Sequence, residues 1–206
     1  LSLDAFVCIV PADSPYDNLD EWREGVADNP GKYSYSTSGF GTGNHLVVSL
    51  LLDSQGIDPE FANHVPYEGD GEVVSSVVGG HVDFTCVNLS PALGQINSGT
   101  VKPLGVTTPE RVDDLPDVPS FSELGYDSME AGVGWSALVG PPDMDGDIVD
   151  AWSDALEQLK DSESWNESVV RLGAIPSIMS PEDTMEFVGN QVAVIRDIVE
   201  RLDLAN

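Results

Sequence analysis

Short runs of β-branched and apolar residues alternate along the chain with longer stretches whose apolar residues recur at helical spacing. The short runs are typical of strands, and apolar residues three and four positions apart are typical of one face of a helix. Strands are expected over residues 6–10, 33–36, 62–65, 83–87, 104–107, 135–139 and 174–178. Amphipathic helices are expected around residues 46–51, 73–78, 148–159 and 185–202. The alternation predicts βαβ units with a largely parallel sheet, and therefore an α/β fold.

The charge balance of the chain is strongly acidic. Its 206 residues include 8 Lys and Arg against 36 Asp and Glu, a formal net charge of −28. Nucleic-acid binders hold phosphates with clustered basic side chains, so this balance excludes that class, and an anionic membrane surface would repel the chain too. Hydrophobic residues make up 41% of the chain, which permits a packed core in one large or two small domains. We interpret the evenly spread acids as a halophilic surface, because concentrated salt screens their mutual repulsion.

The chain opens on an apolar run and has no segment of membrane-spanning length. No apolar stretch reaches the roughly 18 residues that cross a bilayer, and no basic leader precedes an apolar one. Residues 1–10 instead resemble a buried strand. We therefore expect that a natural segment upstream of this strand has been removed.

The two cysteines, Cys8 and Cys86, lie in separate apolar runs that are expected to form strands. Neither belongs to a CxxC pair or to a Cys/His spacing that would bind a metal. Buried free thiols are therefore expected, with a disulfide between the two as the alternative.

The most informative stretch is the segment 36–45, which is rich in glycine and hydroxyl groups and lies between an expected strand and an apolar helix. Its glycines allow a tight turn close to a ligand, and the unpaired N–H groups of the helix start point at whatever fills that turn. A carboxylate or phosphate would fit there, although such a turn can also simply connect a strand to a helix without binding a ligand. His45, in the first helical turn, could contact the anion or simply pack. The hydroxyl groups are those of Ser36, Thr37, Ser38 and Thr42, and the glycines are Gly39, Gly41 and Gly43.

The same segment also resembles a dinucleotide-binding fingerprint. Its spacing is Gly-x-Gly-x-Gly, however, which lacks the third glycine of G-x-G-x-x-G, and the expected strand before it is polar. Asp58 or Glu60, about 20 positions on, could hold a ribose. A nucleotide-binding α/β enzyme of the oxidoreductase kind is therefore the alternative function.

Other patterns for catalysis or metal binding are missing from the sequence. No Gly-Lys-Ser or Gly-Lys-Thr occurs, and the segment around Ser136 lacks the closing glycine of a nucleophile elbow. His45, His64 and His81 stand on separate expected elements without metal-ligand spacing. The acidic run 143–147 has its glycine in the wrong position for an EF-hand and fits a solvated helix start. We expect no enzyme activity, no metal and no cofactor.

An ordered series of short motifs extends over nearly the whole chain. The first half contains VPADSP at 10–15, NPGK at 29–32, the segment 36–45, HVPYEG at 64–69, VGGHVD at 78–83 and NL at 88–89. The second half contains VKPLGVTT at 101–108, LPDVPSF at 115–121 and ELGY at 123–126. In this order and spacing, the chain resembles the extracytoplasmic solute receptors of the tripartite tricarboxylate transporter system, the TctC or Bug family.

The resemblance implies an α/β fold like that of type II periplasmic binding proteins, in which two lobes close over a small organic carboxylate. Residues 1–129 would form one complete ligand-binding lobe, and residues 130–206 would return to the other lobe, whose N-terminal part is missing. The implied function is that of an extracytoplasmic receptor, secreted or anchored at the cell surface, which delivers a di- or tricarboxylate or related acid to membrane permease subunits. The missing part would leave a sheet edge open, which a second copy could cover as a homodimer.

The resemblance also implies a set of ligand-binding residues. The turn around Ser38, with His45 behind it, matches the carboxylate-binding turn of the family, and Asn88 matches a position that faces the cleft. Val87 stands where the family commonly has an acidic residue, so the family's ligand preference need not transfer. Tyr67 and Trp135 are expected either to line the cleft or to pack at the seam between the lobes. The expected ligand-binding residues are Ser36, Ser38, Gly39, Gly41, Thr42, His45, Tyr67 and Asn88.

Overall fold

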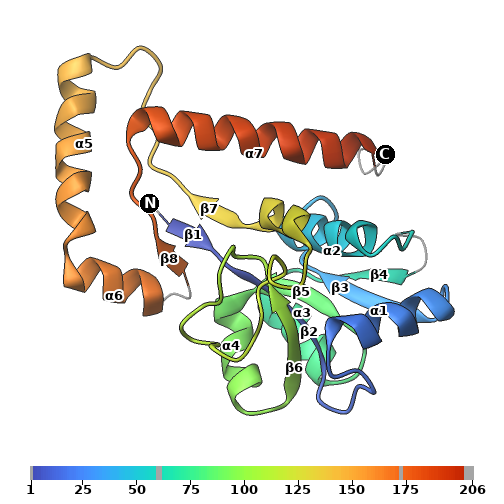
Figure 1. Cartoon of the computed structure of the whole chain (residues 1–206). Helices are drawn as coiled ribbons and strands as arrows, with labels where there is room; N and C mark the ends of the chain where they lie inside the picture. The colour runs from blue at the N-terminus through green and yellow to red at the C-terminus, as the bar shows by residue number, and fades with distance from the viewer. Residues whose placement is uncertain (1, 59–61, 172–173, 202–206) are drawn as a thin grey trace.

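The main sheet is mixed. The computed structural model describes residues 2–58, 62–171 and 174–201 (Figure 1). In it, β2 (Phe6–Pro11) lies between β5 (Thr85–Asn88) and β6 (Val101–Val106) and runs antiparallel to both. Strands β3 (Tyr33–Thr37) and β4 (Ala62–Pro66) pair in parallel, and a parallel bridge between Tyr35 and Phe84 places β3 beside the start of β5. Strands β3, β4, β5 and β6 therefore share one direction.

The expectation of a largely parallel sheet holds for these four strands but is wrong for β2. Apolar periodicity shows that residues 6–10 form a buried strand, but it carries no information about strand direction. The first strand of a βαβ pattern would ordinarily run parallel to its neighbours. Here β2 instead continues from β1 (Ser2–Asp4), which belongs to a second sheet, and it enters the main sheet against the direction of β5 and β6.

Helices cover both faces of the main sheet. Alternate residues of β2 point to opposite faces: Phe6, Cys8 and Val10 enter one apolar cluster, and Val7 and Ile9 enter the other. Helices α1 (Leu19–Asp28) and α2 (Gly43–Ser54) pack in the first cluster, and α3 (Asp70–Val78) and α4 (Leu89–Asn97) pack in the second. The core therefore sits on both sides of β2, as in a three-layer α/β unit.

Two of these helices, α1 and α4, were not expected from the sequence. Half of the residues of helix α1 are charged, and the helix buries only Leu19, Trp22 and Val26, which is too narrow a stripe to stand out as an amphipathic pattern. Its start is fixed by Asn18, whose side-chain oxygen accepts a hydrogen bond from the Glu21 backbone N–H at 3.0 Å. Helix α4 has few buried side chains and includes Pro91 in its first turn, a position that proline tolerates.

The second sheet joins the beginning and the end of the chain. Strand β1 lies between β7 (Gly134–Ser136) and β8 (Ala174–Pro176) and is antiparallel to both. A 3-10 helix, η2 (Asp127–Gly132), leads from the first sheet into this part of the molecule. The helices α5 (Gly146–Lys160), α6 (Glu163–Arg171) and α7 (Pro181–Arg201) complete it, with α5 standing away from the main sheet (Figure 1).

The C-terminal helices differ in how they are covered. Helix α7 crosses back towards α2 (Figure 1), where Ile198 is 2% exposed and Arg201 pairs with Asp53. Helix α5, which the structure describes in full, has no buried side chain, and its Trp152 is 54% exposed. Across the described residues, no helix combines the length and the apolar character needed to cross a bilayer.

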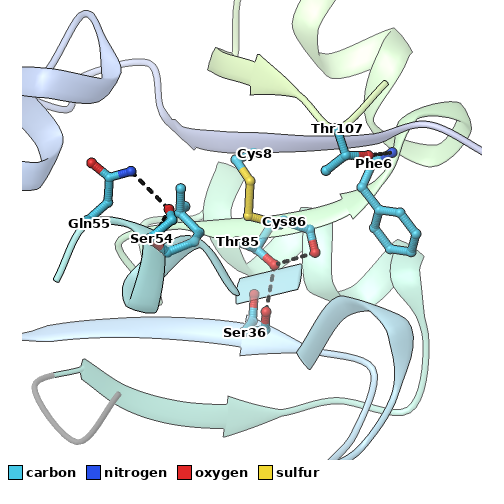
Figure 2. Close-up of a disulfide and its surroundings, with 9 residues drawn as sticks. Phe6, Cys8, Ser36, Ser54, Gln55, Thr85, Cys86 and Thr107 are labelled. Carbon is cyan, nitrogen blue, oxygen red and sulfur yellow. Dashed lines mark hydrogen bonds between the residues drawn. A yellow bond between two sulfur atoms is a disulfide. The ribbon is translucent and has the colours of Figure 1, made fainter. Parts of the chain in front are cut away.

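The expectation of free thiols is wrong, because Cys8 and Cys86 form a disulfide. The antiparallel register of β2 and β5 places the two residues directly opposite each other, with Cα atoms 3.9 Å apart (Figure 2). The cysteines are 78 positions apart in the sequence, and only the pairing of the two strands brings them together. The cross-link therefore ties the first strand of the main sheet to the strand whose end carries Asn88.

Candidate functional site

The turn between β3 and α2 is built on two glycines with backbone angles that favour glycine. Gly39 has φ +122° and Gly41 has φ +72°. Thr42 is the N-cap of α2, but its hydroxyl donates to the Gly39 carbonyl at 2.7 Å and makes no capping bond to the helix. The first N–H groups of an α-helix have no partner within the helix, so the α2 start presents uncapped donors at this turn. Donors of this kind, at the positive end of a helix dipole, suit an anion.

A chain of polar side chains joins this turn to the ends of the neighbouring strands. The Ser38 hydroxyl donates to Asn44 Oδ1 at 3.2 Å, and Asn44 Nδ2 donates to Asp70 Oδ1 at 3.1 Å. Asn88 Nδ2 donates to Asp70 Oδ2 at 2.8 Å. These residues come from the turn after β3, the start of α2, the start of α3 and the end of β5. The carboxyl ends of strands that share one direction meet at one edge, which is where open α/β sheets bind ligands.

Two histidines support the turn from behind. His45 is 2% exposed, and its Nδ1 accepts a hydrogen bond from the Gly41 backbone N–H at 3.4 Å, so its ring proton resides on Nε2. The His64 ring lies with its centroid 4.9 Å from that of His45, and His64 Nε2 is 2.6 Å from the Thr37 hydroxyl. Phe40, which is 58% exposed, covers His45 with ring centroids 4.4 Å apart.

Both imidazoles are held neutral. Burial, followed by the neighbouring His64, lowers the pKa of His45 to about 4. Burial also lowers the pKa of His64 from its ordinary value. At neutral pH, the two rings therefore bring no positive charge to the turn, and the attraction for an anion rests on backbone N–H groups and hydroxyls.

The basic side chains whose ion pairs the structure describes are engaged with acids elsewhere. Lys102 pairs with Asp17 at 2.6 Å, Arg111 with Glu123 at 2.8 Å and Lys160 with Glu157 at 2.7 Å. Within the described ranges, no group of three or more His, Cys, Asp or Glu side chains could hold a metal ion.

The expected ligand-binding residues fall into two sets. Ser38, Gly39, Gly41, Thr42 and Asn88 lie at the turn or in the polar chain described above, at the same edge of the sheet.

Ser36, His45 and Tyr67 lie behind or beside that surface. Ser36 is fully buried, and its backbone oxygen accepts a hydrogen bond from the Thr85 hydroxyl at 2.5 Å (Figure 2). Tyr67 is partly buried and packs against the second apolar cluster, and its N–H donates to the Thr37 carbonyl at 2.8 Å. Trp135 packs edge-to-face on Phe187, with ring centroids 6.2 Å apart.

Sequence reasoning missed Asn44, Asp70 and the support given by His64. The signals were weak: Asn44 is a single amide inside an apolar helix, and Asp70 follows a glycine at an acidic helix start of a common kind. His64 was considered as a metal ligand and rejected because the spacing of the histidines does not fit one, and nothing in the spacing 45 to 64 predicts that the two rings meet. Their contact depends on the pairing of β3 with β4.

The sequence and the fold both match known proteins. Residues 1–204 match the model of a family described as the tripartite tricarboxylate transporter family receptor. The UPF0065 protein in the gbd 5' region of Cupriavidus necator is 30% identical over 202 residues, which cover 98% of this chain and 60% of that protein. The chain thus spans 60% of the length of this curated relative.

Solved structures give the same result. One described as a periplasmic transporter is 28% identical with a TM-score of 0.83, and the match covers 98% of this chain and 66% of that chain. MatC from Rhodopseudomonas palustris, solved with bound malate, is 24% identical with a TM-score of 0.72, and the match covers 100% of this chain and 68% of that chain. At this identity, the match supports a shared fold and nothing more. The expected fold, like that of periplasmic binding proteins, is confirmed, with about a third of each matched chain lying outside the match.

Proposed function

The chain belongs to the tripartite tricarboxylate transporter receptor family, and from that premise we propose that it is an extracytoplasmic receptor for a small organic carboxylate. Proteins of this family and fold bind solutes and are not enzymes, so the nucleotide-binding enzyme considered for the Gly-x-Gly-x-Gly segment is not retained. Of the two acids that could have held a ribose in such an enzyme, Asp58 or Glu60, Glu60 lies outside the described residues.

The observation that carries the proposal is the uncapped start of α2 beneath the turn 38–42. A carboxylate of the ligand would accept hydrogen bonds from the first N–H groups of α2. The Ser38 and Thr42 hydroxyls, which donate to Asn44 Oδ1 and to the Gly39 carbonyl in this structure, would turn to donate to that carboxylate instead. Hydrogen bonds to charged groups contribute about 1.5–3 kcal/mol each, so several of them reach the roughly 8 kcal/mol of a micromolar complex. Asn88 would contact a more distant part of the same ligand. A di- or tricarboxylate, or a related acid, has the size and charge for this arrangement.

The remaining parts of the proposal concern location and delivery. The disulfide between Cys8 and Cys86 is compatible with an oxidising compartment outside the cytoplasm. A receptor in that compartment would hand its carboxylate to membrane permease subunits. Uptake of a labelled acid by cells or vesicles that carry the permease, with and without this protein, tests that step.

Calorimetric titration with succinate, malate, citrate and adipate tests binding by the chain itself. Thr42→Ala and Ser38→Ala remove one hydroxyl each from the proposed contact surface and should weaken the binding of whichever acid gives the largest heat. Ser168→Ala is a matched control, because Ser168 is exposed on α6, its hydroxyl donates to the Ser164 carbonyl, and it is far along the chain from the turn.

Loss of affinity in both turn variants but not in the control supports the proposal. An unchanged dissociation constant in both turn variants removes the turn from the binding site. A chain that binds none of the four acids contradicts the proposal as a whole.

A further inference from the structure

Asp70 places a negative charge within the candidate anion-binding site. It is the first residue of α3, it is partly exposed, and both of its carboxylate oxygens accept hydrogen bonds from amide nitrogens. Asn44 holds Oδ1 at 3.1 Å and Asn88 holds Oδ2 at 2.8 Å. These bonds fix the position of the carboxylate and leave part of its acceptor capacity free, because each oxygen can accept more than one bond.

Asp70 belongs to the same chain of hydrogen bonds as the turn that would bind the anion. A single side chain, that of Asn44, separates the Asp70 carboxylate from the Ser38 hydroxyl. The two histidines at the turn are neutral at neutral pH and offer no compensating charge. Two carboxylates that lie close together at a protein surface repel each other. A ligand that presents only carboxylates would therefore meet repulsion at this point.

We propose that Asp70 makes the site select a carboxylate that carries an ammonium group close to that carboxylate, over the same carbon skeleton without a donor. The ligand carboxylate lies at the turn and the α2 start, and its ammonium group donates to Asp70. A hydroxyl in the same place also donates, but without the charge, so a hydroxy acid ranks between the two. The inference rests on the proposed function, because it requires that a carboxylate binds at the turn.

Three acids with the same four-carbon skeleton separate these effects. L-Aspartate, L-malate and succinate carry an ammonium group, a hydroxyl and a hydrogen at the second carbon. Titration of the wild-type chain should give dissociation constants in the order aspartate, malate, succinate, from tightest to weakest, with at least a tenfold difference between the first and the last. Succinate binding as tight as aspartate binding would overturn the inference while leaving the proposed function intact.

Asp70→Asn tests whether Asp70 is the cause of that order. The variant should bring the ratio of the aspartate and succinate dissociation constants to within about threefold of one, mainly by weakening aspartate. Asp150→Asn makes the same charge change on exposed α5 and should leave the ratio unchanged. A tenfold ratio that persists in a folded Asp70→Asn chain overturns the inference, and the wild-type ranking remains a test if that variant fails to fold. Binding of none of the three acids, nor of citrate or adipate, overturns the proposed function and the inference with it.

Discussion

The rings of His45 and His64 pack against each other behind the turn, with their centroids 4.9 Å apart and their planes tilted by 41°. One ring comes from the first turn of α2 and the other from the middle of β4. His45 accepts the Gly41 N–H, and His64 is within hydrogen-bond distance of the Thr37 hydroxyl, so each ring supports one side of the turn. Protonation of either ring would bring a positive charge into a buried place next to the other imidazole.

Acidification should therefore destabilise the protein through His45. Its pKa is lowered to about 4 in the folded chain, whereas an unfolded histidine titrates near 6.5. Between these values the unfolded chain binds more protons, so this contribution to the free energy of unfolding is fully present above about pH 6.5 and declines as the pH falls towards 4. Urea unfolding at several pH values should show a shallower pH dependence for His45→Gln than for the wild type in this range.

His81→Gln is the matched control for that experiment. The His81 ring is exposed and belongs to the loop after α3, away from the turn. Its replacement should leave the wild-type pH dependence in place. Equal slopes for the wild type and His45→Gln between pH 4 and 6.5 would show that His45 is not held neutral.

The cross-link between Cys8 and Cys86 should contribute substantially to stability. It closes a loop of 78 positions and so restricts the unfolded chain, an effect worth about 2–4 kcal/mol. The double variant Cys8→Ala/Cys86→Ala should lose free energy of unfolding of that order in urea titrations. In the unreduced wild type, a thiol reagent should find no reactive group even after unfolding. Two reactive thiols per chain under those conditions would contradict the cross-link.

The sequence predicted the parts of the fold that depend on local patterns. The strand β2 and the helix α2 have the apolar runs and spacing that their types require, and the turn before α2 is visible in its glycines. Strand direction, the partner of a cysteine and the meeting of two histidines depend on which strands pair. The antiparallel pairing of β2 sets its strand direction and places Cys8 opposite Cys86, and the pairing of β3 with β4 brings the two histidines together.

The candidate site also divides into residues that local sequence patterns or the resemblance could identify and residues that only the folded chain brings together. Ser38 could be named from the glycine-rich turn, and Asn88 from the resemblance to the receptor family. Asp70 could not, because its importance comes from two amides that reach it from α2 and β5, and neither is near it in the sequence. Ser36 was named because it lies beside the turn in the sequence, yet its side chain is fully buried, and the Ser76 hydroxyl donates to it at 3.0 Å.

The left-handed backbone at Gly41 allows a test that separates strain from binding. An alanine at φ +72° should cost about 1–2 kcal/mol of stability, because a Cβ in this conformation crowds the following carbonyl. Gly31 has φ +75°, and a Cβ there would also meet nothing within 4 Å, so Gly31→Ala carries the same strain without touching the turn. Both variants should lose similar stability, and only Gly41→Ala should weaken carboxylate binding measured by calorimetry. An equal loss of affinity in both variants would show that the weaker binding of Gly41→Ala comes from its lower stability alone.

Salt should strengthen both the fold and the proposed binding. At a net charge of −28, acidic side chains repel one another and repel an incoming carboxylate in dilute buffer. The Debye length falls from about 10 Å at 0.1 M to about 3 Å at 1 M, so long-range repulsion is screened, while hydrogen bonds at the α2 start act at contact distance and are weakened less. Thermal unfolding and calorimetric titration in 0.1, 0.5, 1 and 2 M KCl should show a rising Tm and a falling dissociation constant. Affinity that declines steadily over this series would mean that direct charge attraction, and not the neutral turn 38–42, holds the ligand.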